Sequence, residues 1–447
     1  MKKRIWFISI VLLCTTLGIF AQGQTEQPSV VRTVTWWHSN SGLLQTAADS
    51  MVEEFNATIG KEKGIVVRSV YQGKSNDVLT KTKALLQEDG NTDLPDLVQL
   101  DASAVLDIRD SKYLISMEKL AKDDSFDLNQ ILEACKLSVT YKGEMIGMPF
   151  NSSTIMLYYN KTAFEEAGIK EPPKDLDELA SVAAKLVQKD AKGKTIRYGV
   201  ANVPTTYELC VWLGQQNGMS LITDQENGHT GLPTKVLFDE NGTMSTFLKK
   251  WKALYATGAL ENLTSDVNSE FSSGKVAMMA ASTSKLTTVL QMVGNRFELG
   301  VANLPRVNDQ ATGGVNVGGG ALYAFDNGSG NSQATWEFVK FATSSKQQLA
   351  WHIATGYFPV NKQTYKDQDF ITYNNEHPLF AVAIKQLQES NPLVQGIWVP
   401  SAYQIYYAFQ SGILKMLVED QGVEETTQAL AKEINGYLTD YAQANPQ

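Results

Sequence analysis

The sequence contains few of the residues that hold metals or cross-link chains. It has only three cysteines and four histidines among 447 residues. The histidines are far apart and show no metal-ligand spacing: they are His38, His229, His352 and His377. We therefore expect no metal site and no cofactor. Two cysteines lie beyond the N-terminal segment, Cys135 and Cys210; one disulfide between them is possible, but a chain of this length does not need it.

The sequence also lacks an excess of positive charge and the motifs of common enzymes. Acidic residues outnumber lysine and arginine by 48 to 39, which gives a net charge of −9. Without a basic stripe, we expect no nucleic-acid partner. There is no Walker sequence, no G-x-S-x-G and no H-E-x-x-H. These absences argue against a nucleotide hydrolase, a serine hydrolase and a zinc peptidase.

A long apolar run occurs only at the N-terminus. Basic residues at 2–4 precede the apolar segment 5–20, and the small residues Ala21 and Gly23 follow. This order is typical of a secretory signal peptide, which we predict over 1–23. No later segment reaches 18 apolar residues, so we expect a soluble, periplasmic or otherwise extracytoplasmic product.

Two other interpretations of the N-terminus remain open. The segment could stay uncleaved as an anchor, although it is short for a membrane span. It could also carry a lipid at Cys14, but Leu13 stands where such a site expects a small residue. The following polar residues, 24–30, read as a linker.

Strand and helix patterns alternate through the first part of the chain. β-branched and aromatic runs alternate with segments of helical apolar spacing: strands at 30–37, 64–73 and 95–100, and helices at 41–60 and 76–89. This alternation predicts an α/β fold with a mostly parallel sheet flanked by helices. Ligands of such sheets bind beyond the carboxyl ends of the strands, which here carry Trp37, His38 and Asp101.

The pattern starts again after residue 148, and 447 residues are too many for one ordinary core. We predict two lobes with a ligand cleft between them. The first comprises 31–148 and about 319–368, and the second comprises 149–318 and about 369–447. A chain that crosses several times between lobes forms hinges beside a cleft.

The stretch "MPFNSST" (148–154) is unusual because its four polar residues directly precede an apolar strand. Small polar groups are costly to bury without partners. We therefore expect Pro149 and Phe150 at the hinge, and Asn151 to Thr154 at the cleft mouth, where ligand and water meet them.

Several motifs recur together and in order between Trp37 and about Leu430. They are "WHS", "PFNSST", "LYYNK", "AFEEAGI", "PPK", "DELA", "SGKVAMM", "GGAL" and "TGY" followed by "PV". This set resembles the extracellular solute-binding proteins of ABC importers, the class that includes maltose-binding protein, and is most similar to its glycerol-3-phosphate-binding members. The resemblance implies a two-lobed periplasmic-binding-protein fold of type II and delivery of the solute to the transmembrane subunits of an ABC permease. We expect the protein to be a monomer.

The resemblance also indicates which positions of this chain correspond to the family's ligand contacts. Four are kept: Ser153 in the crossing, Ser282 after the Ala-Met strand, Gly319 of the glycine run, and Tyr357 after Thr-Gly. Taken alone, serines at strand ends are more often turn residues than ligand contacts.

Three family positions differ. A tyrosine of the glycerol-3-phosphate binders is Ser75 here, and their acid falls on Ala102, beside Asp101. Their arginine, a phosphate anchor, falls on Tyr406. Arginine offers a charged fork to phosphate, whereas tyrosine offers one neutral hydroxyl.

The aromatic stretch 396–410 supplies Trp398, Tyr403, Tyr406 and Tyr407 in place of a cation. Aromatic faces beside polar groups suit sugar rings. We therefore favour a sugar, oligosaccharide or polyol as the solute, with glycerol-3-phosphate or a glycerophosphodiester as the alternative.

Three of these residues have structural interpretations as well. Trp36 and Trp37 point to opposite faces of a strand, so one of them is expected in the core. His38 could satisfy the start of the next helix, and Asp101 could cap a helix.

Two further functions are consistent with a secreted chain of this kind. A secreted glycoside hydrolase needs two carboxylates across the sugar, and only Asp101 is expected at the cleft. A role in chemoreception is not separable from import by sequence.

Overall fold

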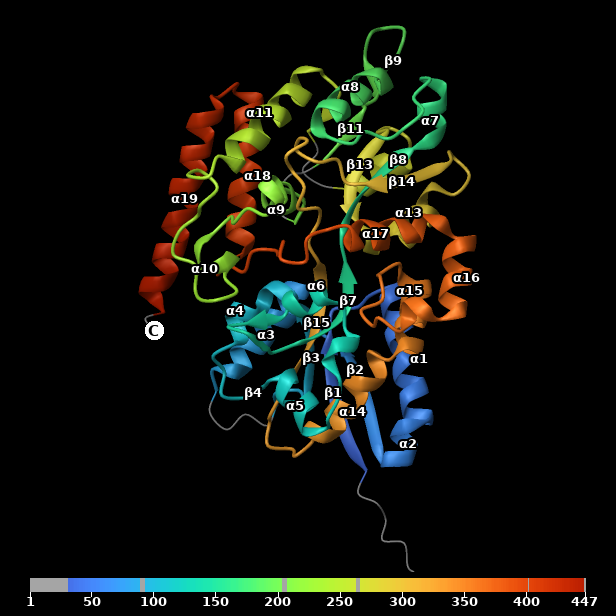
Figure 1. Cartoon of the computed structure of the whole chain (residues 1–447), viewed down its shortest axis with the longest axis vertical. Coiled ribbons are helices and arrows are strands. Elements are labelled where there is room, and N and C mark those ends of the chain that lie inside the picture. Colours follow the sequence, from blue (N-terminus) through green and yellow to red (C-terminus); the bar gives the residue numbers. More distant parts are fainter. Residues whose placement is uncertain (1–30, 89–92, 203–206, 263–265, 401, 446–447) are drawn as a thin grey trace, which may run out of the picture.

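The structure is a computed structural model that describes residues 31–88, 93–202, 207–262, 266–400 and 402–445. It contains two main β-sheets, one above the other in Figure 1, each packed among helices. We call the first sheet with its helices the first half of the molecule, and the second sheet with its helices the second half. Within these ranges no helix is long and apolar enough to cross a membrane. The predicted signal peptide with Cys14 and the predicted linker lie outside the described residues.

The first sheet collects strands from distant parts of the chain. They are β1 (Arg32–His38), β2 (Ile65–Tyr71), β3 (Leu97–Asp101), β4 (Leu114–Ile115), β7 (Met148–Ser153) and β15 (Gly318–Phe325). Their order is β2-β1-β3-β15-β4, with β7 also paired to β15. β1 runs parallel to β2 and β3, whereas β15 runs antiparallel to β3, β4 and β7.

The second sheet is built in a similar way. Its strands are β8 (Ile155–Asn160), β11 (Val200–Ala201), β12 (Leu260–Glu261), β13 (Met278–Ser282) and β14 (Leu299–Asn303). Their order is β12-β11-β13-β8-β14. β11 is parallel to β12 and β13, and β8 is antiparallel to β13 and β14.

Both sheets are mixed, whereas the sequence pattern predicted mostly parallel sheets. The cause is the crossing of the chain. β15 enters the first sheet at the edge where β3 ends, so that Gly320 pairs with Asp101. β8 enters the second sheet where β13 ends, so that Ile155 pairs with Ser282. β15 and β8 each arrive from the other sheet, at the edge where the neighbouring strand has its carboxyl end. Each therefore runs antiparallel to that neighbour.

Helices surround both sheets (Figure 1). With the first sheet lie α1 (Leu43–Ala57), α2 (Ile59–Lys63), α3 (Ser75–Leu86), α4 (Val105–Ile108), α5 (Met117–Asp123), α6 (Glu133–Leu137), α14 (Ser332–Ala342) and α15 (Ser345–Thr355). With the second lie α7 (Lys161–Glu166), α8 (Leu176–Leu186), α9 (Tyr207–Gly214), α10 (Asp224–Asn227), α11 (Thr243–Ala256), α12 (Val267–Ser272), α13 (Leu286–Val293), α16 (Gln368–Glu376), α17 (Pro378–Gln388), α18 (Ala402–Val418) and α19 (Val423–Ala444). Two short hairpins complete the fold, β5–β6 (Thr140–Tyr141, Glu144–Met145) and β9–β10 (Gln188–Lys189, Thr195–Arg197).

Local sequence explains individual helices. In α1 the buried residues Ala48, Met51, Val52 and Phe55 follow helical spacing and face the core. α8 begins at Asp175, whose carboxylate accepts the backbone N–H of Glu178 and so satisfies a free donor of the first turn.

Large aromatic side chains fill the two cores. In the first half, Trp36 contacts Phe150 and Phe338 with ring centroids 5.9 and 5.4 Å apart. In the second half, Trp212 packs on Trp251 at 5.3 Å. Each aromatic side chain removes a large apolar area from water, which makes these clusters the main stabilising contribution of each half.

The two cysteines do not form a disulfide. Cys135 in α6 and Cys210 in α9 are both buried and free. Burial raises the pKa of each thiol to about 12, so both stay protonated at neutral pH.

The segment 148–153 is a strand, which the sequence interpretation missed. All six residues of β7 are buried, and the strand pairs with β15 in the first sheet. The predicted lobe boundary at 148/149 thus falls at the start of β7, and the chain leaves the first sheet at Thr154. The chain crosses again before β15 and, finally, between Lys362, whose N–H bonds to Gln130, and α17, which packs on β14.

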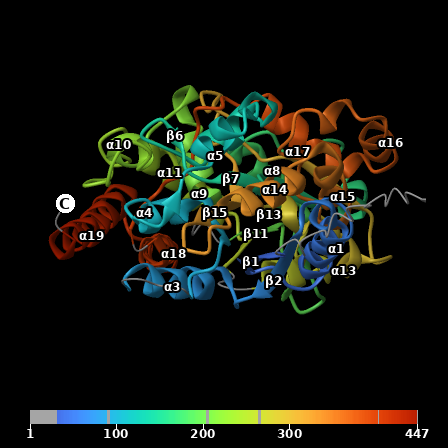
Figure 2. The same ribbon diagram turned by 90° about the horizontal axis from the view of Figure 1, so that it is seen from below.

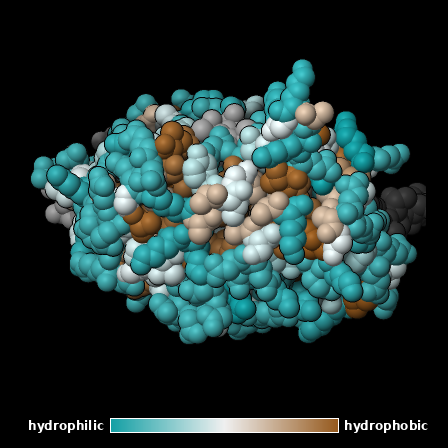
Figure 3. All heavy atoms as spheres, turned by 90° about the horizontal axis from the view of Figure 1, so that it is seen from above, coloured by the Kyte–Doolittle hydropathy of each residue, from teal (hydrophilic) through white to brown (hydrophobic). Residues whose placement is uncertain are grey.

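The outer surface of the second half is largely hydrophilic, with separate apolar patches (Figure 3). Such scattered apolar patches are normal on soluble domains and need no partner to explain them.

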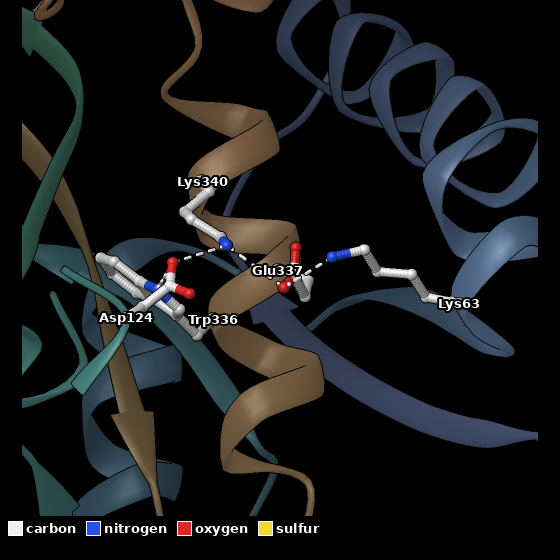
Figure 4. A network of polar contacts seen from close by, with 5 residues as sticks. All are labelled: Lys63, Asp124, Trp336, Glu337 and Lys340. Atoms are coloured by element: carbon white, nitrogen blue, oxygen red, sulfur yellow. Dashed lines mark hydrogen bonds and ion pairs between the residues drawn. The ribbon is translucent and has the colours of Figure 1, made fainter. Parts of the chain in front are cut away.

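A charged network ties α14 to two neighbouring segments of the first half (Figure 4). The ammonium group of Lys340 lies 2.7 Å from Asp124 and 3.1 Å from Glu337, which also pairs with Lys63 at 2.8 Å. The indole N–H of Trp336 donates to the same Asp124 oxygen at 3.0 Å. The hydrogen bonds from Lys340 and Trp336 hold the pKa of Asp124 below its usual value.

This network predicts a contribution to stability that depends on pH. A carboxylate whose pKa is lower in the folded state stabilises the fold above its unfolded pKa, here 3.8, and loses that effect as the pH falls further. The Asp124 side chain is 34% exposed, so we expect Asp124→Asn to cost only about 1 kcal/mol at pH 7. Urea unfolding at pH 7 and pH 3 should show a smaller cost at the lower pH.

Asp123→Asn is the matched control, because it removes a neighbouring exposed carboxylate that makes no ion pair with any described residue. Equal effects of the two substitutions at pH 7 would contradict the role assigned to Asp124.

Candidate functional site

A cavity of about 640 Å³ lies between the two halves. Figures 1 and 2 both place α3 and α4 on the same side of the molecule as α18 and α19, and the cavity is lined from these elements. Other lining residues come from the ends of β3 and β7, the start of β15, and the segment 395–398. Volumes of about 300–1,000 Å³ are usual for small-molecule sites.

Asp101 stands at the end of β3 and faces the cavity. One carboxylate oxygen accepts the backbone N–H of Ser103 at 2.9 Å and its hydroxyl at 2.7 Å, which caps the short helix 102–104. The other oxygen accepts no hydrogen bond from a described residue. The side chain is accessible from the cavity, yet the surrounding walls desolvate it and raise its pKa. Asp101 thus caps a helix and also offers an acceptor to a ligand.

The glycine run 318–320 brings backbone to the cavity wall. Gly319 has φ of +102°, and a Cβ atom there would lie 2.1 Å from the backbone oxygen of Asn151. At Gly318 a Cβ atom would lie 2.5 Å from the ring of Tyr207. Only glycine permits this approach of β15 to β7 and Tyr207.

The buried polar residues at the crossing have partners. The side-chain oxygen of Asn151 accepts an N–H of Gln99 at 3.0 Å. The hydroxyl of Thr154 donates to the backbone oxygen of Asn316 at 2.9 Å, and its backbone oxygen accepts the N–H of Thr283 at 2.8 Å. These bonds join strands of both sheets, so the polar residues stabilise the crossing itself.

Tyr207 closes the inner end of the cavity. Its hydroxyl lies 2.9 Å from the backbone oxygen of Asn316 and 3.1 Å from that of Ser153. Burial raises its pKa well above the usual value, so the hydroxyl remains a donor to these carbonyls.

Aromatic side chains form one wall of the cavity. Trp398 is stacked on the imidazole of His229, with centroids 3.7 Å apart and planes 24° from parallel. Tyr403 and Tyr407 of α18 are 49% and 67% exposed, and Tyr406 lies between them. These exposed rings are unusual for a soluble surface and are available to stack on a ligand.

The cavity carries little positive charge. Among its described lining residues, Lys83 is the one lysine or arginine, and it is paired with Asp107. Burial lowers the pKa of His229, which therefore stays neutral at pH 7. Asp101 remains as the acidic group without a cationic partner among the described residues, so the lining does not favour an anion.

The halves also touch at the rim of the cavity. The backbone N–H of Lys142, in the β5–β6 turn of the first half, donates to the backbone oxygen of His229 at 2.9 Å. The neighbouring Tyr141 ring lies 6.4 Å from Trp398. The rim contact therefore connects directly to the aromatic wall.

Six of the ten site residues expected from the sequence line this cavity. They are Ser75, Asp101, Ser153, Gly319, Trp398 and Tyr406. Their contact with a ligand remains a prediction, but the fold brings them together from five separate segments of the chain.

Four expected residues do not line it. Trp37 packs against the first core, on the strand face opposite Trp36. His38 is fully buried; its ring accepts the N–H of Asn40, and burial lowers its pKa to about 4, in keeping with the structural interpretation. Ser282 caps the helical turn 283–285, accepting the N–H of Ser284.

Tyr357, the fourth expected residue, is buried and is not part of the cavity lining. It is 9% exposed and follows Gly356, which ends α15 with φ of +85°. Burial raises its pKa, and interactions with the side chains of Ser284 and Asn151 oppose this rise. Its ring therefore connects the two halves rather than facing the cavity.

The sequence interpretation missed several lining residues, among them Tyr207, His229, Lys83 and Asp107. Lys83 and Asp107 lie on the outer turns of α3 and α4, and nothing in the sequence distinguishes them from solvated charges. His229 was noted only as a scattered histidine without metal-ligand spacing. Within the described ranges no group of metal-ligating side chains occurs.

Comparison with known proteins identifies the family. The family model described as bacterial extracellular solute-binding protein matches residues 50–378. The chain belongs to this family. It is a solute-binding protein of the ABC-transporter type and not an enzyme, so the alternative of a secreted hydrolase is wrong.

Among its relatives is the sn-glycerol-3-phosphate-binding periplasmic protein UgpB of Yersinia pestis bv. Antiqua. This solute-binding protein and the relative are 26% identical over 403 residues, which cover 86% of this chain and 85% of the relative.

Solved structures confirm the fold. UgpB from Mycobacterium tuberculosis in complex with glycerophosphocholine matches with a TM-score of 0.75 at 21% identity, over 92% of this chain and 98% of that chain. The cyclic alpha-maltosyl-1,6-maltose binding protein from Arthrobacter globiformis matches with 0.75 at 22% identity, over 91% and 99%. The predicted α/β periplasmic-binding-protein fold is therefore correct.

The glycine run predicts a specific sensitivity to substitution. Gly319→Ala should destabilise the protein by more than about 2 kcal/mol, because it adds a backbone clash to a left-handed conformation. Gly328→Ala is the matched control, since Gly328 has φ of +80° with open space around it, and should cost about 1 kcal/mol. Urea unfolding measures both, and equal costs would contradict the close approach of β15 to Asn151.

Proposed function

We propose that the solute is a sugar, an oligosaccharide or a polyol, whose uncharged rings bind in the cavity between the halves. The observation that carries the proposal is the pairing of an exposed aromatic wall with a carboxyl group. Sugar C–H faces stack on aromatic rings, and carboxyl oxygens accept sugar hydroxyls. Tyr403, Tyr406 and Tyr407 supply the rings, and Asp101 supplies the acceptor.

The charge of the cavity supports this choice over glycerol-3-phosphate. A phosphate requires cationic or oriented N–H donors. Lys83 is already paired with Asp107, and the position of the family's arginine is Tyr406, which does line the cavity. A phosphate here would also approach Asp101, which repels it.

The proposed mechanism is closure of the two halves around the solute. A ligand that contacts both halves favours the closed state by its difference in affinity for the two states. The closed shape is then recognised by the transmembrane subunits of a permease. We also propose that the protein acts as a monomer in the periplasm, after removal of the predicted signal peptide.

Isothermal titration calorimetry tests the ligand class. Neutral mono- to trisaccharides and polyols, glycerol-3-phosphate and glycerophosphocholine are titrated in parallel. We expect micromolar binding of at least one neutral sugar and none of glycerol-3-phosphate. Micromolar glycerol-3-phosphate or glycerophosphocholine with no heat from any sugar would overturn the proposal.

Tyr406→Phe tests the assigned wall. The substitution keeps the ring but removes the hydroxyl, so sugar affinity should fall about five- to tenfold while the fold persists. Tyr255→Phe is the control, because Tyr255 is a half-buried tyrosine in α11 outside the cavity lining. A similar loss in both variants would exclude a direct role for Tyr406.

A further inference from the structure

A second pocket of about 660 Å³ adjoins the cavity. The two share Lys83, Asp107 and Tyr441 as lining residues, so they are continuous around these side chains. We call the second pocket the annex. It lies between α3, α4 and the β5–β6 turn on one side and Leu232 and the end of α19 on the other.

The annex differs from the cavity in its charge. Its described lining contains three cations, Lys83, Arg109 and Lys142, and two carboxylates, Asp107 and Asp110. Asp110 lies 3.1 Å from Arg109, but its side chain is 80% exposed and therefore well screened by water. The lining of the annex therefore has a net positive charge. The lining of the adjoining cavity has one unpaired charged group among its described residues, the carboxylate of Asp101.

Arg109 is built into the annex wall. Its side chain is only 6% exposed, and its guanidinium lies 5.4 Å from the centre of the Tyr141 ring. One terminal nitrogen donates to the backbone oxygen of Leu106, whereas Nε has no hydrogen-bond partner among the described residues. The guanidinium of Arg109 is therefore held in place and contributes a fixed positive charge to the annex wall.

Lys142 adds a second cation over the same ring. Its ammonium group lies 5.3 Å from the centre of Tyr141, and its side chain is exposed. Cation–π contacts with Tyr141 thus keep the charged groups of Arg109 and Lys142 close together in the lining of the annex.

We propose that the annex binds an anionic group, a carboxylate or a phosphate, carried by a sugar whose neutral part occupies the cavity. This inference rests on the proposed function, since the neutral part must bind the aromatic wall. The solute class would then be an acidic oligosaccharide. The neutral residues stack on the tyrosines of α18, and the charged end reaches past Lys83 towards Arg109 and Lys142.

Matched pairs of neutral and acidic sugars test the proposal by calorimetry. The pairs are β-1,4-mannotriose, α-1,4-galactotriose and cellotriose, each with the trisaccharide of the same linkage that carries a single terminal uronate, and trehalose with trehalose 6-phosphate. In at least one pair the acidic sugar should bind about three- to tenfold more tightly than the neutral one. Raising NaCl from 50 to 500 mM should reduce this difference. A uronate preference identifies carboxylate as the anion, and preference for trehalose 6-phosphate alone identifies phosphate.

Substitution of Lys142 connects the preference to the annex. Lys142→Gln should reduce the acidic preference about threefold, and Lys142→Glu should abolish it. Both variants leave the backbone contact to His229 available, and thermal unfolding checks that they fold. Lys170→Glu is the control, since it makes the same charge reversal at an exposed lysine just beyond α7 in the second half.

The outcomes separate the two proposals. Equal affinity within every pair, with neutral sugars bound, would overturn the annex and leave the proposed function standing. An acidic preference that Lys142→Glu does not change would also overturn the annex. No binding of any sugar would overturn both.

Discussion

The hydrogen-bonded crossing at Asn151 to Thr154 is the constraint on which the rest of the molecule depends. Here the chain leaves one sheet and enters the other, and every side chain of β7 is buried. Buried amides and hydroxyls are tolerated only when they are paired. Asn151 bonds to Gln99 in the first sheet, and Thr154 bonds to Asn316 and Thr283 near the second. Asn151 thereby anchors β7 within the first sheet, while Thr154 ties the crossing segment to the backbone on either side of it.

The same crossing determines what the cavity can offer a ligand. Because β15 must pass close to β7 and Tyr207, the cavity wall at that point is glycine. Side chains for recognition must come from elsewhere, from the end of β3 and from α18. Asp101 and the tyrosines thus lie on opposite halves, which is the arrangement required for a solute to draw the halves together.

The sequence was sufficient for the fold class and for about half of the candidate site. Asp101 was predictable because it ends a strand, and the carboxyl ends of neighbouring parallel strands meet at one edge, whereas Ser153 was predicted only from the family motif. Tyr406 was predictable from the family motif. The strand β7 was missed because its polarity resembles a loop; only its partners, which lie far away in sequence, make burial possible.

The remaining errors have a common physical origin. His38 and Tyr357 were expected at the ligand, but both are buried outside the cavity lining: Nδ1 of His38 accepts the N–H of Asn40, and Tyr357 interacts with the side chains of Ser284 and Asn151. Conversely, His229 gave no signal because its position depends on a rim contact between its backbone and Lys142. A local pattern reports whether a residue can make polar contacts, whereas the choice between a ligand and a protein partner is made by tertiary packing. Trp398 is an example: one face of its indole ring is stacked on His229, so only its other face and its edges are available to a ligand.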